Sequence, residues 1–138
     1  MKHLLLFGTL MLLCASSTVT HHLTIEVSFA KAMKGKVMLG IYREKDQFPK
    51  QDTRYKWLVI TPHGTTAIGV FTDLPKGKYA VAAYLDENKN LYLDKNMVGY
   101  PTEPFGFSNN ARVKFSAPTF EEAAIELHSD RKIQIKLE

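Results

Sequence analysis

Oxygen-bearing side chains recur at alternate positions in one short polar segment, DENKNLYLD, at residues 86–94. They stand at positions 1, 3, 5 and 9 of the segment, which are Asp86, Asn88, Asn90 and Asp94. A loop wound around calcium directs such side chains inward and adds a backbone carbonyl at position 7, which here belongs to Tyr92. The spacing therefore predicts a calcium site with five of the roughly six to eight oxygen ligands that the ion takes.

Two positions depart from the calcium loop of an EF-hand. Its glycine at position 6 is replaced by Leu91, and its glutamate at position 12 by Met97. Glu103 is the nearest carboxylate that would replace the missing ligand, and Asn96 is a further oxygen donor. With so few charged ligands, the affinity is expected to be modest. The alternative is an ordinary turn, since Asp and Asn readily bond their own backbone.

A second candidate is the aromatic, proline-containing segment at residues 99–110. Aromatic side chains on a loop stack on sugar rings or hold a protein partner. The residues predicted to contact such a protein or carbohydrate ligand are Tyr100, Phe105, Phe107 and Asn109. The alternative is that the aromatics fold inward and cap the end of the domain. If a metal is bound, Glu103 would join the two segments.

The chain carries no recognisable catalytic motif. It has no G-x-S-x-G, H-E-x-x-H or glycine-rich phosphate loop. We therefore expect a protein that is not an enzyme. The alternative within catalysis is a small secreted hydrolase that uses the loop carboxylates Asp86, Asp94 and Glu103.

The first residues resemble a secretory signal peptide. Lys2 and His3 precede an apolar run at residues 4–13, and small residues follow, so cleavage is expected after Ser17. A helix that spans a membrane needs about 20 apolar residues, and this run is shorter. No stable membrane span is therefore expected after the signal is removed. The interpretation places the protein in the periplasm or outside the cell. A lipoprotein signal acylated at Cys14 is the alternative, although Leu13 suits it poorly.

The amino-acid composition excludes several further classes of function. Cys14 is the only cysteine, so the mature chain would have no disulfide, thiol chemistry or thiolate metal ligand. The 18 Lys and Arg against 14 Asp and Glu give +4, which falls to +3 when Lys2 is removed. These basic residues are spread along the chain, so nucleic acid is not an expected partner.

After the signal, hydrophobic periodicity is that of strands. Period-two segments bounded by turn residues are expected at 23–29, 37–41, 57–60, 66–71, 79–85, 111–115, 123–127 and 133–137. The first two are expected to pair as a hairpin, and residues 74–77 to form a tight turn. The strand at 79–85 is apolar on both faces, which places it at the centre. We predict an all-β, antiparallel Greek-key β-sandwich of about seven strands as a single domain at residues 18–138. A closed barrel is the structural alternative.

A set of short motifs lies between Phe71 and Phe115: D-L-P at 73–75, Gly77 and Tyr79, the Asp/Asn series just described, and G-F-S-N at 106–109. In these motifs the segment resembles the bacterial family known as domain of unknown function 2141. The resemblance extends from about Leu23 to the C-terminus. Members often carry glycine where this chain has Leu91. The resemblance implies export, a sandwich related to prealbumin-like and immunoglobulin-like domains, and no assigned activity.

These observations favour an exported, non-enzymatic β-sandwich that serves as a binding or accessory module, with calcium as its expected ion at the 86–94 loop. A structural envelope protein without a ligand is the remaining alternative.

Overall fold

The computed structural model describes residues 16–138, so all of the expected signal peptide except Ser16 and Ser17 lies outside the described residues. The strands are β1 (Thr20–Ser28), β2 (Lys36–Tyr42), β3 (Lys56–Ile60), β4 (Thr66–Pro75), β5 (Gly77–Asp86), β6 (Phe105–Phe107), β7 (Ile125–Leu127) and β8 (Arg131–Lys136). The helical elements are the 3-10 turns η1 (Gln51–Thr53) and η2 (Ser108–Asn110) and the single-turn helix α1 (Phe120–Ala123). Within this part of the chain, no helix has the length and apolar character needed to cross a membrane.

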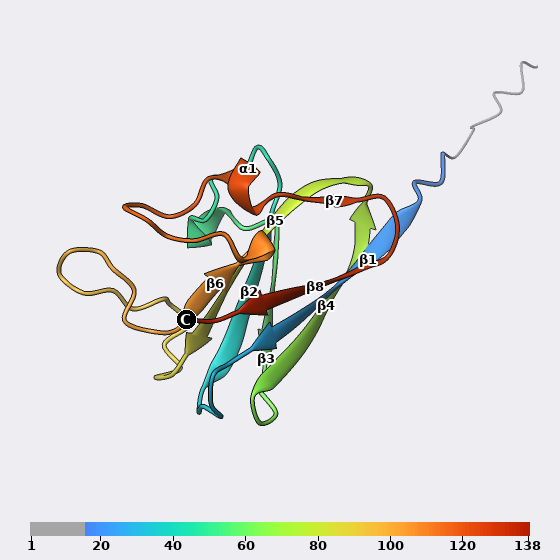
Figure 1. Cartoon of the computed structure of the whole chain (residues 1–138). Coiled ribbons are helices and arrows are strands. Elements are labelled where there is room, and N and C mark those ends of the chain that lie inside the picture. The colour runs from blue at the N-terminus through green and yellow to red at the C-terminus, as the bar shows by residue number, and fades with distance from the viewer. Residues whose placement is uncertain (1–15) are drawn as a thin grey trace, which may run out of the picture.

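The strands form two layers, which confirms the predicted all-β sandwich (Figure 1). One sheet has the order β4-β1-β8 and the other the order β3-β2-β5-β6, with β7 paired to the start of β5. The chain passes from β1 into the other sheet for β2 and β3, and β4 then returns to lie beside β1, as in a Greek key. One pair departs from the predicted antiparallel pattern, because β8 runs parallel to β1.

Three local predictions were wrong. The segments predicted to pair as the first hairpin lie in different sheets: β1 pairs with β4 and β8, and β2 pairs with β3 and β5. The predicted tight turn at 74–77 is only a bend at Lys76, where the chain crosses between sheets. Residues 111–115 form a loop, because β6 already occupies the edge position beside β5 that this segment would need.

The core lies between the sheets and follows the period-two pattern. In β5, Val81, Ala83 and Leu85 face inward and are buried. Each large apolar side chain buried in this way contributes about 1.5–3 kcal/mol to folding. The opposite face of β5 is also largely covered, by the loops at 43–55, 87–104 and 111–119. This second, outer layer is where the candidate site lies.

Candidate functional site

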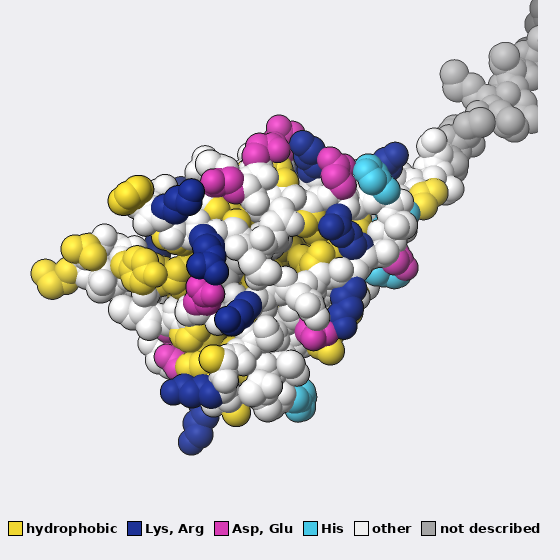
Figure 2. All heavy atoms as spheres, in the orientation of Figure 1, with side chains coloured by type: hydrophobic (Ala, Val, Ile, Leu, Met, Phe, Trp, Pro, Cys, Tyr) yellow, Lys and Arg dark blue, Asp and Glu magenta, His cyan; other side chains and the backbone are white. Residues whose placement is uncertain are grey.

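A cavity of about 640 Å³ lies on the outer face of the β3-β2-β5-β6 sheet. Its floor includes Gly40 of β2 and Ala82 of β5, two small residues paired across neighbouring strands. A larger side chain at Ala82 would fill the space, and Gly40 leaves room for the Arg54 side chain, which crosses it. The three loops that cover this face supply the walls, and Figure 1 shows two of them projecting together beyond β6. Hydrophobic side chains gather at that end of the molecule (Figure 2).

A continuous series of aromatic rings runs along one side of the cavity. Tyr42 contacts Phe48 edge-on at 5.1 Å between ring centroids, and Phe48 contacts Phe107 at 5.7 Å. The series continues through Phe105, 5.9 Å from Phe107, to Tyr100, a further 6.0 Å away. All five residues line the cavity. Edge-to-face pairs of this kind are favourable arrangements of aromatic rings, so the rings form one continuous apolar wall.

Arg54 is a charged residue in the lining of this cavity. Its methylenes cross Gly40 so closely that a Cβ at Gly40 would lie 2.5 Å from Arg54 Cδ. The guanidinium carbon is 5.5 Å from the centre of the Trp57 ring. Among the described residues, Arg54 Nε has no hydrogen-bond partner although the atom is buried. Buried donors are nearly always satisfied, so Arg54 Nε is an exception among the described residues.

Two tyrosines connect the floor of the cavity to its walls. The Tyr42 hydroxyl donates to Pro49 O at 3.1 Å, and the Tyr84 hydroxyl donates to Leu91 O at 2.8 Å. Burial raises the pKa of Tyr42 strongly, and burial raises the pKa of Tyr84 to about 12. Both phenols therefore stay protonated at neutral pH. They hold the 43–55 and 87–104 loops against the sheet.

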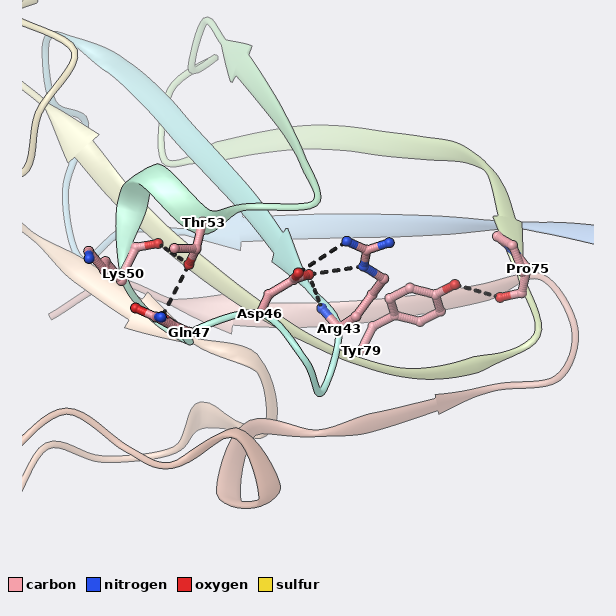
Figure 3. A network of polar contacts seen from close by, with 7 residues as sticks. All are labelled: Arg43, Asp46, Gln47, Lys50, Thr53, Pro75 and Tyr79. Carbon is pink, nitrogen blue, oxygen red and sulfur yellow. Dashed lines mark hydrogen bonds and ion pairs between the residues drawn. The ribbon is translucent and has the colours of Figure 1, made fainter.

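The 43–55 loop is fixed at its start by Asp46 (Figure 3). The carboxylate accepts a hydrogen bond from the Arg43 backbone N at 2.8 Å and two from the guanidinium, from Nε at 3.0 Å and Nη2 at 3.1 Å. The guanidinium also stacks on the Tyr55 ring at 4.0 Å. Hydrogen bonding from Arg43 holds the pKa of Asp46 below its usual range. This network sets the direction in which the chain leaves β2 and so helps place Phe48 and Arg54.

We expect Asp46→Asn to lower the thermal midpoint at pH 7, because the amide loses the charge and the forked acceptor. Since the folded pKa of Asp46 is depressed, its contribution is complete above the unfolded value of about 3.9 and is lost as pH falls through the folded value. The difference between variant and wild type should therefore shrink below about pH 4. Thermal unfolding followed by circular dichroism between neutral and acidic pH measures this. An undiminished difference at acidic pH would contradict it.

The predicted calcium segment is a tight loop held together by its own side chains. Asp86 is fully buried, and its carboxylate accepts hydrogen bonds from the backbone N of Asn90 at 3.1 Å and of Leu91 at 2.9 Å. Leu91 adopts a positive φ of 70°, the backbone conformation that glycine usually provides. The structure thus places a leucine in the strained position where an EF-hand has glycine.

The remaining donors of the segment meet at Asp94. The side-chain amides of Asn88 and Asn90 both donate to its carboxylate, and Asn90 Oδ1 accepts from the backbone N of Tyr92 at 2.9 Å. Glu103 is buried and binds elsewhere on the loop: it accepts from Glu87 N at 2.9 Å and from Asp94 N at 3.0 Å. Asp94, Asn88 and Asn90 are therefore adjacent, whereas Asp86 and Glu103 are directed at backbone donors.

The fit of this cluster to a cation depends on the two amides. Within residues 16–138, no three or more His, Cys, Asp or Glu side chains are arranged to hold a metal ion. Rotating the Asn88 and Asn90 amides to present their oxygens beside Asp94 would break the hydrogen bonds that these oxygens accept from Asn90 N at 3.1 Å and from Tyr92 N at 2.9 Å. Binding of a cation would exchange these two bonds for metal ligation, and Asn88, Asn90 and Asp94 are side chains of the type that calcium uses.

The structure brings together three of the four residues predicted to bind a partner and places the fourth, Asn109, elsewhere. Tyr100, 54% exposed, and the half-buried Phe105 line the cavity with Phe107, which is only 7% exposed. Asn109 faces away, and its amide donates to Ala124 O at 2.7 Å and Glu122 O at 3.3 Å. Its neighbour Ser108 is fully buried and joins Val81 N to Ala123 O. Asn109 and Ser108 thus anchor the loop that carries the aromatics.

The fold and the site define a class: an all-β sandwich with an aromatic-walled cavity on the outside of one sheet. The chain belongs to the bacterial family DUF2141, described as an uncharacterized protein conserved in bacteria, whose model matches residues 25–136. The match confirms the resemblance and covers all of the cavity-lining residues. No curated protein and no solved structure matched the chain.

Proposed function

We propose that this protein is an exported, non-enzymatic β-sandwich module that binds a small ligand, or a protruding group of a protein or carbohydrate partner, in the cavity on its outer sheet face. The cavity itself carries the proposal. Its volume of about 640 Å³ falls within the range of about 300–1,000 Å³ common for ligand sites, and such sites are mostly apolar with a few placed polar groups.

Export rests on residues 1–17, where a basic start, an apolar run and small residues follow in the order of a secretory signal. The mature chain has no cysteine after that segment, so its folding depends on the apolar core in either redox environment. We accordingly propose a periplasmic or secreted location.

The hydrogen bonds of the loop carboxylates support a protein that is not an enzyme. In the hydrolase alternative, Asp86, Asp94 and Glu103 would act on a substrate. Each of them instead accepts two hydrogen bonds from loop amides. Among the described residues that line the cavity there is no carboxylate, imidazole or thiol, and these are the side chains that most often act as catalytic bases or activated nucleophiles.

Calcium is proposed as a stabiliser of the cavity wall, with Asn88, Asn90 and Asp94 as its side-chain ligands and the Tyr92 carbonyl as a backbone ligand. Tyr92, Lys95 and Tyr100 of the same loop line the cavity. A bound cation would neutralise the Asp94 carboxylate and hold this wall in place.

The thermal midpoint of the mature domain should therefore rise by several degrees on going from EDTA to millimolar calcium, with magnesium as the control. A ligand bound only by the folded state adds about 2.7 kcal/mol at a hundredfold excess over its dissociation constant. Asp94→Asn should abolish the rise, whereas Glu87→Gln, an exposed carboxylate in the same loop, should retain it. An equal midpoint in EDTA and calcium would remove calcium from the proposal.

Uptake of an uncharged fluorescent dye such as Nile red tests the cavity. We expect saturable binding by the mature domain and its loss in Ala82→Phe, since the added ring occupies the floor. Val59→Phe is the matched control, because Val59 is 43% exposed on β3 of the same sheet and does not line the cavity. No saturable binding, or equal binding by both variants, would favour the structural envelope protein without a ligand.

A further inference from the structure

We propose that the ligand of this cavity is an amphipathic organic anion: a flat apolar body carrying a carboxylate that bonds to Arg54. This inference rests on the proposed function and names the class of ligand. It is carried by the combination of a buried unpartnered guanidinium nitrogen, a lining with cations and no acids, and a wall of aromatic rings.

The position of Arg54 is imposed by its surroundings. Its methylenes lie against Gly40, the only type of residue that leaves room for them, since a Cβ there would meet Cδ at 2.5 Å and Cγ at 3.0 Å. Trp57 stands over the guanidinium. Arg54 Nε has no acceptor among the described residues. A carboxylate bound at the guanidinium would supply one through a charged hydrogen bond, which is the stronger kind.

The charge of the lining has one sign. Lys50, Arg54 and Lys95 line the cavity, and no Asp or Glu does so among the residues that the structure describes. The amide of Gln51 donates to Leu91 O at 2.6 Å and so joins the 43–55 and 87–104 loops at the rim. A lining whose charged groups are all positive attracts a negatively charged ligand, and the partly buried Arg54 is less screened by water than the exposed Lys50 and Lys95.

The apolar lining of the cavity determines which kind of apolar group the ligand carries. The rings from Tyr42 to Tyr100 form one continuous apolar wall, and the lining also includes Val98 and Phe115, which are 86% and 104% exposed. Such a wall is matched by a flat ring system or an apolar chain. A small inorganic anion would leave most of it in contact with water.

Naphthoate and its uncharged analogue naphthylmethanol are the probes, with affinity measured by calorimetry and by the fluorescence of Trp57, the only tryptophan. Wild type should bind naphthoate at least about tenfold more tightly than the alcohol, as expected for a charged hydrogen bond. Arg54→Met should lose that preference while binding the alcohol within about twofold of wild type, which also reports that the variant is folded. Arg131→Met, the same change on β8 of the other sheet, should behave like wild type.

Equal affinity of wild type for naphthoate and the alcohol would overturn the anion inference and leave the binding module intact. A preference that survives in Arg54→Met would overturn the role of Arg54. Displacement of naphthoate by inorganic phosphate at similar concentration would overturn the amphipathic requirement. If neither probe binds and Nile red is also not taken up, the proposed function fails together with this inference.

Discussion

Replacing Asp86 with alanine should destabilise the mature domain by about 2–4 kcal/mol and lower its thermal midpoint by on the order of 10 °C. Asp86 ends β5, is fully buried and accepts from two backbone N–H groups of the following loop. Leu91 N loses its acceptor in the variant, and Leu91 no longer has support for its positive φ. Buried donors without partners and strained backbone are among the few causes of such large effects. Thermal and urea unfolding measure the change.

Glu87→Ala is the matched control for that variant. Glu87 is the next residue, its side chain is exposed, and its backbone N remains free to donate to Glu103. The substitution should change the free energy of unfolding by no more than about 0.5 kcal/mol. If the two alanine variants were equally stable, the 86–94 loop would not depend on Asp86, and the description of this cavity wall would be wrong.

Gly106→Ala is the second substitution with a large expected effect. It should lower the free energy of unfolding by about 2–3 kcal/mol. An added Cβ would lie 2.6 Å from Lys136 O, a backbone atom, and 3.0 Å from Ile135 Cγ2. This is where β6 meets the end of β8, through the paired backbone hydrogen bonds of Phe105 and Glu138. The methyl group would force the two sheets apart at this edge. Urea unfolding of the variant measures the cost.

Gly77→Ala serves as the control for the second variant, because the nearest atom to its Cβ, Tyr79 Cε2, would be 3.9 Å away, an ordinary contact. Gly77 also begins a strand, so the comparison keeps the same chemical change in the same type of element. Wild-type stability in Gly106→Ala would contradict the close approach of β6 and β8.

The strands themselves could be predicted because burial of one face imposes a period of two. β1, β2, β5 and β8 lie where apolar residues alternate or run continuously. Their pairing could not be predicted in the same way. Alternation says which face of a strand is buried but not which sheet contains the strand, and so the segments of β1 and β2 were wrongly paired as a hairpin.

The site could be predicted in part. Residues 86–94 and Glu103 were expected to belong together, and Glu103 does bind the loop, through backbone donors at Glu87 and Asp94. The expected aromatic segment supplies three rings of the cavity wall. Arg54 and Phe48 were missed because the polar segment that contains them has no periodicity. The only signal in the sequence was the pair of small residues, Gly40 and Ala82, on outward-facing positions of apolar strands.

An NMR titration of residues 18–138 with naphthoate shows directly which face of the sandwich binds the ligand. We expect saturable shifts at Gly40 and Ala82 and in the loops that line the cavity, with the Arg54 Nε–H resonance moving most because it gains an acceptor. Shifts centred on β4, β1 and β8, or no saturable shift at the cavity, would contradict the claim that this face of the sandwich is the binding site.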